Sequence, residues 1–172
     1  ETPLTAVSVA RDMSTGSGEG ETGGPGTDPV HVLHVEDDEA FADLAATYLE
    51  RDDGGAPLSV TTTTDPETAL DRVGDADCVV SDYEMQAMDG LDLLEAVRED
   101  HPELPFVLFT GRGSEGIASD AISAGVTDYI QKGTGTDQYA VLANTVRNAV
   151  GRRRAREDAQ RGEQRLRRAL DL

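Results

Sequence analysis

Short apolar runs alternate along the chain with segments whose apolar residues recur at helical spacing. The runs cover residues 30–35, 58–64, 77–82, 106–110 and 127–132. They are rich in β-branched residues, which is typical of strands. Each run is followed by a helical pattern, carried by Phe41, Leu44, Ala45, Tyr48 and Leu49, then Ala69, Leu70 and Val73, then Leu91, Leu94 and Val97, then Ile117, Ala121 and Ile122, then Tyr139, Leu142, Val146 and Val150. Strand and helix therefore alternate five times, which predicts a parallel sheet with helices on both faces.

The two ends of the chain differ in texture from this alternating part. Residues 1–29 are rich in Gly, Ser, Thr and Glu and hold few large apolar side chains, so they are predicted to be a disordered tail. Residues 30–150 form the predicted folded domain. Residues 151–172 carry eight arginines and four acids and are predicted to be a helical linker towards a further domain.

Small and apolar residues recur in the linker at alternating steps of four and three. They are Ala155, Ala159, Gly162, Leu166 and Ala169. This spacing is a heptad seam, which predicts that the last helix continues through the linker and pairs weakly with a second copy of itself. Two alternatives remain open at this point: a solvated, frayed helix, or non-specific binding of nucleic acid by the arginines.

Charge separates the main body from the linker. The chain has 34 acidic and 15 basic residues, and Lys132 is its single lysine. This composition is typical of a protein adapted to molar salt, where the repulsion between acidic side chains is screened beyond about 3 Å. An acidic mesophilic protein is the alternative. Residues 1–150 carry a net charge of −23, so the main body is not expected to bind nucleic acid.

Other residue classes narrow the function by what they exclude. No apolar run is long enough for a transmembrane helix, and no signal peptide is visible. The single cysteine, Cys78, excludes an internal disulfide and is expected in the core. His31 and His34 lack the spacing of metal ligands and are expected to be hydrogen-bonded structural residues, while His101 is expected to be exposed.

Residues that could take part in chemistry lie at the carboxyl ends of four predicted strands. Glu36, Asp37 and Asp38 follow the first strand, Asp82 closes the third, Thr110 closes the fourth and Lys132 closes the fifth. Because parallel strands end at the same edge of a sheet, these side chains should converge. Converging carboxylates repel one another unless a cation joins them, and oxygen ligands suit Mg²⁺. An aspartate in such a site can accept a phosphoryl group.

Four motifs in this order resemble the receiver domain of response regulators in two-component signalling. They are VEDDEAF, SDYEMQAMDGLDLL, LFTGRGS and YIQKG, and the resemblance extends from Val30 to about Val150. It implies a flavodoxin-like, doubly wound sheet of five parallel strands in the order 2-1-3-4-5. It also implies a cytoplasmic protein that takes a phosphoryl group from a histidine kinase, switches conformation and later dephosphorylates itself.

The resemblance also assigns roles to single residues. Asp82 accepts the phosphoryl group, and Lys132 pairs with the phosphate and the Asp82 carboxylate. Mg²⁺ is bound by Asp37 and Asp82 directly, by Glu36 through water and by the backbone carbonyl of Glu84. Thr110 and Tyr129 form the switch, in which Thr110 turns its hydroxyl to a phosphate oxygen and Tyr129 follows between outward and inward rotamers. Asp38 is interpreted instead as the N-cap of the first helix.

Two positions depart from the family pattern, and two other functions stay open. Gln86 and Gly133 stand where the family usually has proline, and Gly133 leaves the path of the loop after Lys132 open. A small Mg²⁺-dependent phosphohydrolase with an aspartate nucleophile is the first alternative, with Glu84 as its acid, although no cap segment is visible. A flavodoxin-like cofactor binder is the second, but the acidic loop EDDE would repel a flavin phosphate.

The linker has a weaker resemblance of its own. RRRAREDAQRGEQRLRRALDL resembles the helix that joins a receiver to a sensor domain in archaeal receiver-first sensor kinases. Together with the acidic composition, this resemblance predicts a halophilic archaeal protein with a downstream sensor or output domain. The chain itself is expected to have no membrane segment and to dimerise weakly at most.

Overall fold

The computed structural model describes residues 28–111 and 115–171. Most of the predicted 1–29 tail, and the Arg112, Gly113 and Ser114 part of the LFTGRGS motif, lie outside the described residues. The strands are β1 (Val30–Val35), β2 (Leu58–Thr63), β3 (Cys78–Ser81), β4 (Phe106–Thr110) and β5 (Asp128–Gln131). The helices are α1 (Glu39–Arg51), α2 (Pro66–Arg72), α3 (Gly90–Asp100), α4 (Glu115–Ala124) and α5 (Asp137–Leu170), with a short 3-10 helix at Val73–Asp75.

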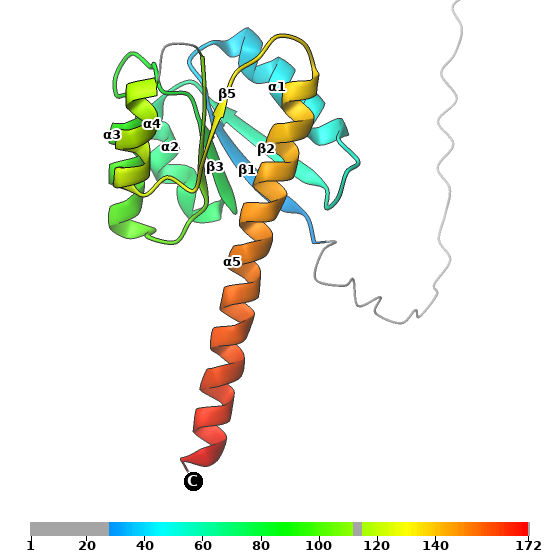
Figure 1. Ribbon diagram of the computed structural model, residues 1–172, viewed down its shortest axis with the longest axis vertical. Coiled ribbons are helices and arrows are strands. Elements are labelled where there is room, and N and C mark those ends of the chain that lie inside the picture. The colour runs from blue at the N-terminus through cyan, green and yellow to red at the C-terminus, as the bar shows by residue number, and fades with distance from the viewer. Residues whose placement is uncertain (1–27, 112–114, 172) are drawn as a thin grey trace, which may run out of the picture.

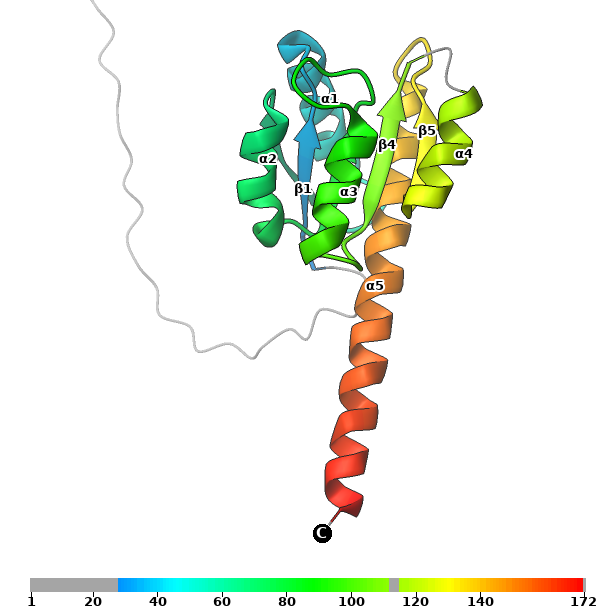
Figure 2. The same ribbon diagram turned by 90° about the vertical axis from the view of Figure 1, so that its left-hand side faces the viewer.

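The strands form one parallel sheet in the order β2-β1-β3-β4-β5, as predicted. Helices cover both faces: α1 and α5 lie on one side, and α2, α3 and α4 lie on the other (Figures 1 and 2). The strand order reverses between β1 and β3, so the carboxyl ends of these two strands flank the switch point where ligands bind in such sheets.

Two apolar cores fill the space between the sheet and its helices. On the α1–α5 face, Cys78, Val80 and Phe109 pack against residues such as Leu142 of α5. On the other face, Val79 and Leu108 pack against α3 and α4. Cys78 is fully buried, as expected, and burial raises the pKa of its thiol to about 12, so it is an inert core residue.

The helix starts follow the expected capping chemistry. Asp38 caps α1, its side chain accepting a hydrogen bond from the Phe41 amide at 3.1 Å, and Asp65 caps α2 immediately before Pro66. Asp89 caps α3 in a reciprocal capping box with Asp92. The Asp38 and Asp65 caps begin α1 and α2 shortly after β1 and β2, whereas the Asp89 cap ends the longer loop that follows β3.

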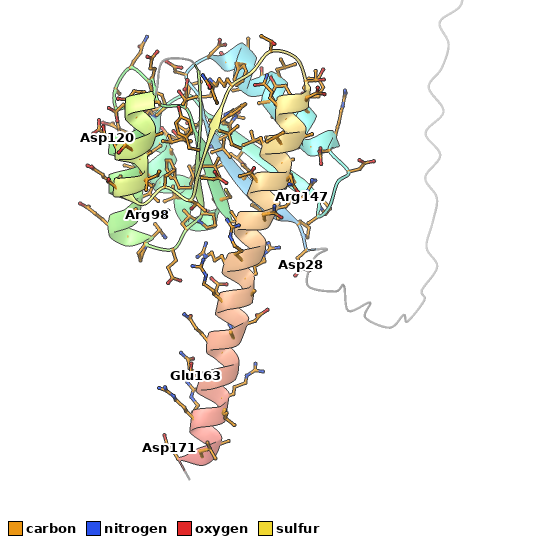
Figure 3. The ribbon with its side chains drawn as sticks, in the orientation of Figure 1. Asp28, Arg98, Asp120, Arg147, Glu163 and Asp171 are labelled. Carbon is orange, nitrogen blue, oxygen red and sulfur yellow. The ribbon has the colours of Figure 1, made fainter. Side chains whose placement is uncertain are left out.

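The last helix, α5, continues well below the domain as one unbroken element through the arginine-rich segment (Figure 1). Two of its arginines tie it to the domain. Arg147, labelled on α5 in Figure 3, donates to the Asp52 carboxylate and to the Asp52 and Ala56 carbonyls. Arg154 donates to the carbonyls of Asp28 and Pro29. Beyond Arg154 most side chains are exposed. None of the described helices is long and apolar enough to cross a membrane.

Candidate functional site

Three carboxylates meet at the switch point between β1 and β3. Ligand oxygens of Glu36, Asp37 and Asp82 all lie within 4.8 Å of one another. Glu36 and Asp82 are buried, whereas Asp37 is exposed. The Asp82 amide donates to the carbonyl of Val35 at 3.0 Å. This bond extends the pairing of β1 and β3 by one residue and holds the start of the loop after β3 beside β1.

Lys132 lies between two of these acids. Its Nζ is 2.8 Å from Oε2 of Glu36 and 3.2 Å from Oδ2 of Asp82. The other oxygen of Asp82, Oδ1, accepts from the Tyr83 amide at 2.7 Å. Both oxygens of the Asp82 carboxylate are thus oriented by donors that come from different strand ends.

Glu36 is the most deeply buried acid of the group. Burial raises the pKa of its carboxyl well above the usual value, the hydrogen bond from Lys132 opposes that shift, and the charge of Asp82 adds to it. Its second oxygen, Oε1, accepts from the Asp38 amide at 3.2 Å. The contact between Glu36 and Lys132 was not predicted from the sequence.

The surrounding pocket contains most of the predicted site residues. It is lined by Glu36, Asp37, Asp38, Asp82, Tyr83, Glu84, Met85, Gln86, Asp89 and Lys132. Thr110 and Tyr129 are not among these lining residues. Thr110 is buried at the end of β4, where its carbonyl accepts from the Lys132 amide at 2.6 Å. Tyr129 is half-buried in β5 and packs against the core beneath α3 and α4.

An all-oxygen donor set at this position fits a hard divalent cation. Carboxylates from two neighbouring strand ends, together with backbone carbonyls of the next loop and water, are the ligands that Mg²⁺ prefers. Asp37, Asp82 and the Glu84 backbone would hold the ion, and its positive charge would offset the mutual repulsion of the acids. Lys132 alone cannot neutralise three carboxylates, so the site retains a net negative charge.

Two histidines in β1 have different environments. His31 is exposed, and its backbone amide donates to Asp77. His34 is fully buried, but neither ring nitrogen has a hydrogen-bond partner among the described residues, so the expectation of a hydrogen-bonded His34 was wrong. Burial, with the nearby charge of Lys132, lowers its pKa to about 4. A neutral His34 avoids placing a further charge beneath Lys132 and Asp82.

The close contact of Gly90 with the backbone of Asp82 was not predicted from the sequence. The Gly90 amide donates to the carbonyl of Tyr83 at 2.8 Å, and a Cβ at Gly90 would lie 2.4 Å from the carbonyl oxygen of Asp82. The start of α3 therefore packs directly on the backbone at Asp82 and Tyr83, where the loop after β3 begins. Only glycine allows this approach, which holds Asp82 at the end of β3.

We expect Gly90→Ala to lower the free energy of unfolding by about 1–3 kcal/mol, because the added methyl group overpacks the Asp82 backbone. Denaturant titration measures this change. Gly151→Ala is the matched control, since no described atom beyond its own stretch of helix lies within 4 Å of the added Cβ, and alanine favours a helix interior. Equal stability of the Gly90→Ala and wild-type proteins would contradict the packing role.

Comparison with known proteins assigns this arrangement to a family. The response regulator receiver domain family matches residues 32–143, which include the acidic strand ends and Lys132. The chain belongs to the response regulator receiver domain family. Five parallel strands in the order 2-1-3-4-5 are the receiver fold, and the phosphoacceptor role fits the position of Asp82 at the end of β3.

Several relatives resemble this receiver domain over most of its length. It is 29% identical over 122 residues to the transcriptional regulatory protein FixJ of Bradyrhizobium diazoefficiens, covering 69% of this chain and 58% of FixJ. It is 31% identical over 127 residues to the nitrogen assimilation regulatory protein NtrX of Azorhizobium caulinodans, covering 72% of this chain and 27% of NtrX. The chain thus spans just over half, or less, of these relatives.

Solved structures agree with the fold. The receiver domain protein of Clostridium thermocellum superposes with a TM-score of 0.65 at 22% identity, covering 73% of this chain and 98% of that one. NtrX from Brucella abortus superposes with a TM-score of 0.65 at 30% identity, covering 77% of this chain and 30% of that one. The similarity to the Clostridium thermocellum structure, at 22% identity, supports the fold alone.

Proposed function

We propose that Asp82 accepts a phosphoryl group from a histidine kinase in the cytoplasm, with Mg²⁺ bound by Asp37, Asp82, the Glu84 carbonyl and, through water, Glu36. The observation that carries the proposal is the Asp82 carboxylate itself. It lies at the switch point with one oxygen on the Tyr83 amide and the other beside Lys132. The ion would supply positive charge for the oxygens of the transferred group.

Residues of this chain carry out the transfer. A carboxylate oxygen of Asp82 forms a bond to phosphorus while the P–N bond of the donor phosphohistidine breaks, and its electron pair returns to the imidazole nitrogen. Lys132 moves from its contact with Glu36 to a phosphoryl oxygen. Thr110 donates its hydroxyl to a second oxygen, and Tyr129 changes rotamer in response. Water later attacks phosphorus, the P–O bond to Asp82 breaks, and inorganic phosphate leaves.

Incubation with acetyl phosphate tests this function directly. With Mg²⁺, intact-mass measurement should show one added phosphoryl group, and removal of Mg²⁺ with a chelator should prevent the addition. Hydrolysis of unrelated phosphate monoesters by the same sample would instead favour the phosphohydrolase alternative. The absence of any adduct in the presence of Mg²⁺ would refute the receiver function.

The surface charge supports a second part of the proposal, a halophilic archaeal origin. Thirty acids and seven basic residues precede residue 151, and the single lysine lies in the site. Unscreened repulsion among these acids costs compactness. A protein adapted to molar salt is therefore consistent with this composition.

Folding is expected to depend on salt as a consequence. Denaturant titrations followed by circular dichroism, without Mg²⁺ and at increasing KCl, measure this dependence. The free energy of unfolding should rise with KCl, because the screening length falls towards about 3 Å at 1 M. Sucrose at matched osmolality is the control, because it favours compact states without screening charge. Full native signal in low salt would contradict the halophilic proposal.

The exposed half of α5 supports the last part of the proposal, a linker to a downstream sensor or output domain. Ala155, Ala159, Gly162, Leu166 and Ala169 form a seam along one helix face. Leu166 is 61% exposed in the single chain. Small seam residues give weak packing, so we propose marginal pairing with a second copy rather than a firm dimer.

Leu166→Glu is expected to abolish the weak pairing through α5, because it would bury a charge in the seam between the two helices. Sedimentation at high concentration in high salt measures the association of both proteins. Glu163→Gln, a change beside the seam, should leave it intact. A wild-type chain that stays monomeric under these conditions would contradict pairing through α5 alone.

A further inference from the structure

The ammonium of Lys132 has an aromatic neighbour as well as its two acids. Its Nζ lies 4.3 Å from the ring centroid of Phe41 in α1 and 5.9 Å from that of Phe109 in β4. A cation within about 6 Å of a ring face is attracted by the negative potential of that face. Phe41 of α1 is therefore a third partner of the lysine.

The ring differs from the two acids in a way that matters for phosphotransfer. Glu36 and Asp82 hold Nζ by charge, and the charge of Asp82 changes when its carboxylate is esterified by the phosphoryl group. The face of Phe41 keeps its potential throughout. It can therefore hold the flexible lysine stem near the pocket while the acids exchange partners.

The Phe41 ring is itself held by other rings. Its centroid lies 6.0 Å from that of Phe109 and 6.3 Å from that of Tyr139 in α5. Tyr139 in turn stacks on Tyr48 of α1, with centroids 4.9 Å apart and planes 2° from parallel. Rings from α1, β4 and α5 thus restrict the position that Phe41 can take, and α5 is part of this support.

We propose that Phe41 is a positioning residue for Lys132, which holds the ammonium where it can reach the phosphoryl group on Asp82. This inference rests on the proposed phosphoacceptor function. A cation–π contact of this kind implies a loss of about tenfold in phosphoryl uptake when the ring is removed. Mg²⁺ binding should not change, because the three carboxylates are unaltered.

The single lysine makes the contact directly measurable. With lysine labelled by ¹³C, NMR should show one set of side-chain signals, with the Lys132 ε-protons shifted upfield by the ring current of Phe41. Phe41→Leu should remove most of this shift, and Phe41→Tyr, which keeps the ring, should retain it. Phe106→Leu is the matched control, because it makes the same change in a buried phenylalanine on the opposite face of the sheet, outside the ring group of Phe41.

Phosphoryl uptake from acetyl phosphate at saturating Mg²⁺ is measured on the same four proteins. We expect Phe41→Leu to be about tenfold slower than wild type, and Phe41→Tyr and Phe106→Leu to have rates close to that of wild type. A wild-type rate in Phe41→Leu, or an equal loss in Phe106→Leu, would overturn the inference. If the wild-type protein takes up no phosphoryl group, the proposed function is refuted. The contact between Phe41 and Lys132 is tested separately, since an ε-proton shift that stays unchanged in Phe41→Leu would overturn it.

Discussion

Asp82→Asn is expected to abolish phosphoryl uptake from acetyl phosphate. An amide cannot form the acyl phosphate, because its oxygen is neutral and a poor nucleophile. The change is nearly isosteric, and the side-chain oxygen can still accept from the Tyr83 amide. Removing one of three converging charges also relieves repulsion, so the variant should be at least as stable as wild type without Mg²⁺.

Intact-mass measurement with Mg²⁺ decides this prediction, and the fold of the variant is checked by circular dichroism. Asp38→Asn is the matched control: Asp38 lines the same pocket, but it caps α1, a role that asparagine fills equally well. We expect this control to be phosphorylated like wild type. An adduct of wild-type size on Asp82→Asn would assign the acceptor to another acid.

The site could be located from sequence because topology leaves little freedom. Once strands and helices alternate five times, the strand ends must share an edge, and Glu36, Asp37, Asp82 and Lys132 must approach one another. Capping residues were equally readable, since Asp38 and Asp65 precede helices whose first turns they bond. These features depend on local chemistry and on the order of the elements.

Other features depend on side-chain contacts across the fold, which spacing does not encode. The Glu36–Lys132 bond joins residues 96 positions apart, and no sequence pattern chooses Glu36 over Asp37 as the nearer partner of the lysine. Gly90 resembles an ordinary helix-start residue until the Asp82 carbonyl is placed against it. The prediction for His34 was wrong because most buried histidines have a hydrogen-bond partner, and this one has none in the part of the chain that the structure describes.

Mg²⁺ is expected to stabilise the wild-type fold, and Asp37→Ala is expected to remove that effect. An ion that binds only the native state adds about 2.7 kcal/mol to the free energy of unfolding at one hundred times its Kd. Asp37 is the exposed member of the acidic group, so its truncation leaves no cavity and no buried unpaired partner. Without Mg²⁺ the variant should match or exceed wild type, because one repelling charge is gone.

Denaturant titrations in high KCl, with and without Mg²⁺, separate the two effects. The wild-type free energy of unfolding should rise with Mg²⁺ concentration and that of Asp37→Ala should stay nearly flat, so their order reverses as the metal is added. Asp38→Asn should follow wild type, because its side chain faces the amide of Phe41. The reversal is the decisive signature: a generally damaged protein would be weaker at every Mg²⁺ concentration. An equal response in Asp37→Ala would place the ion away from Asp37.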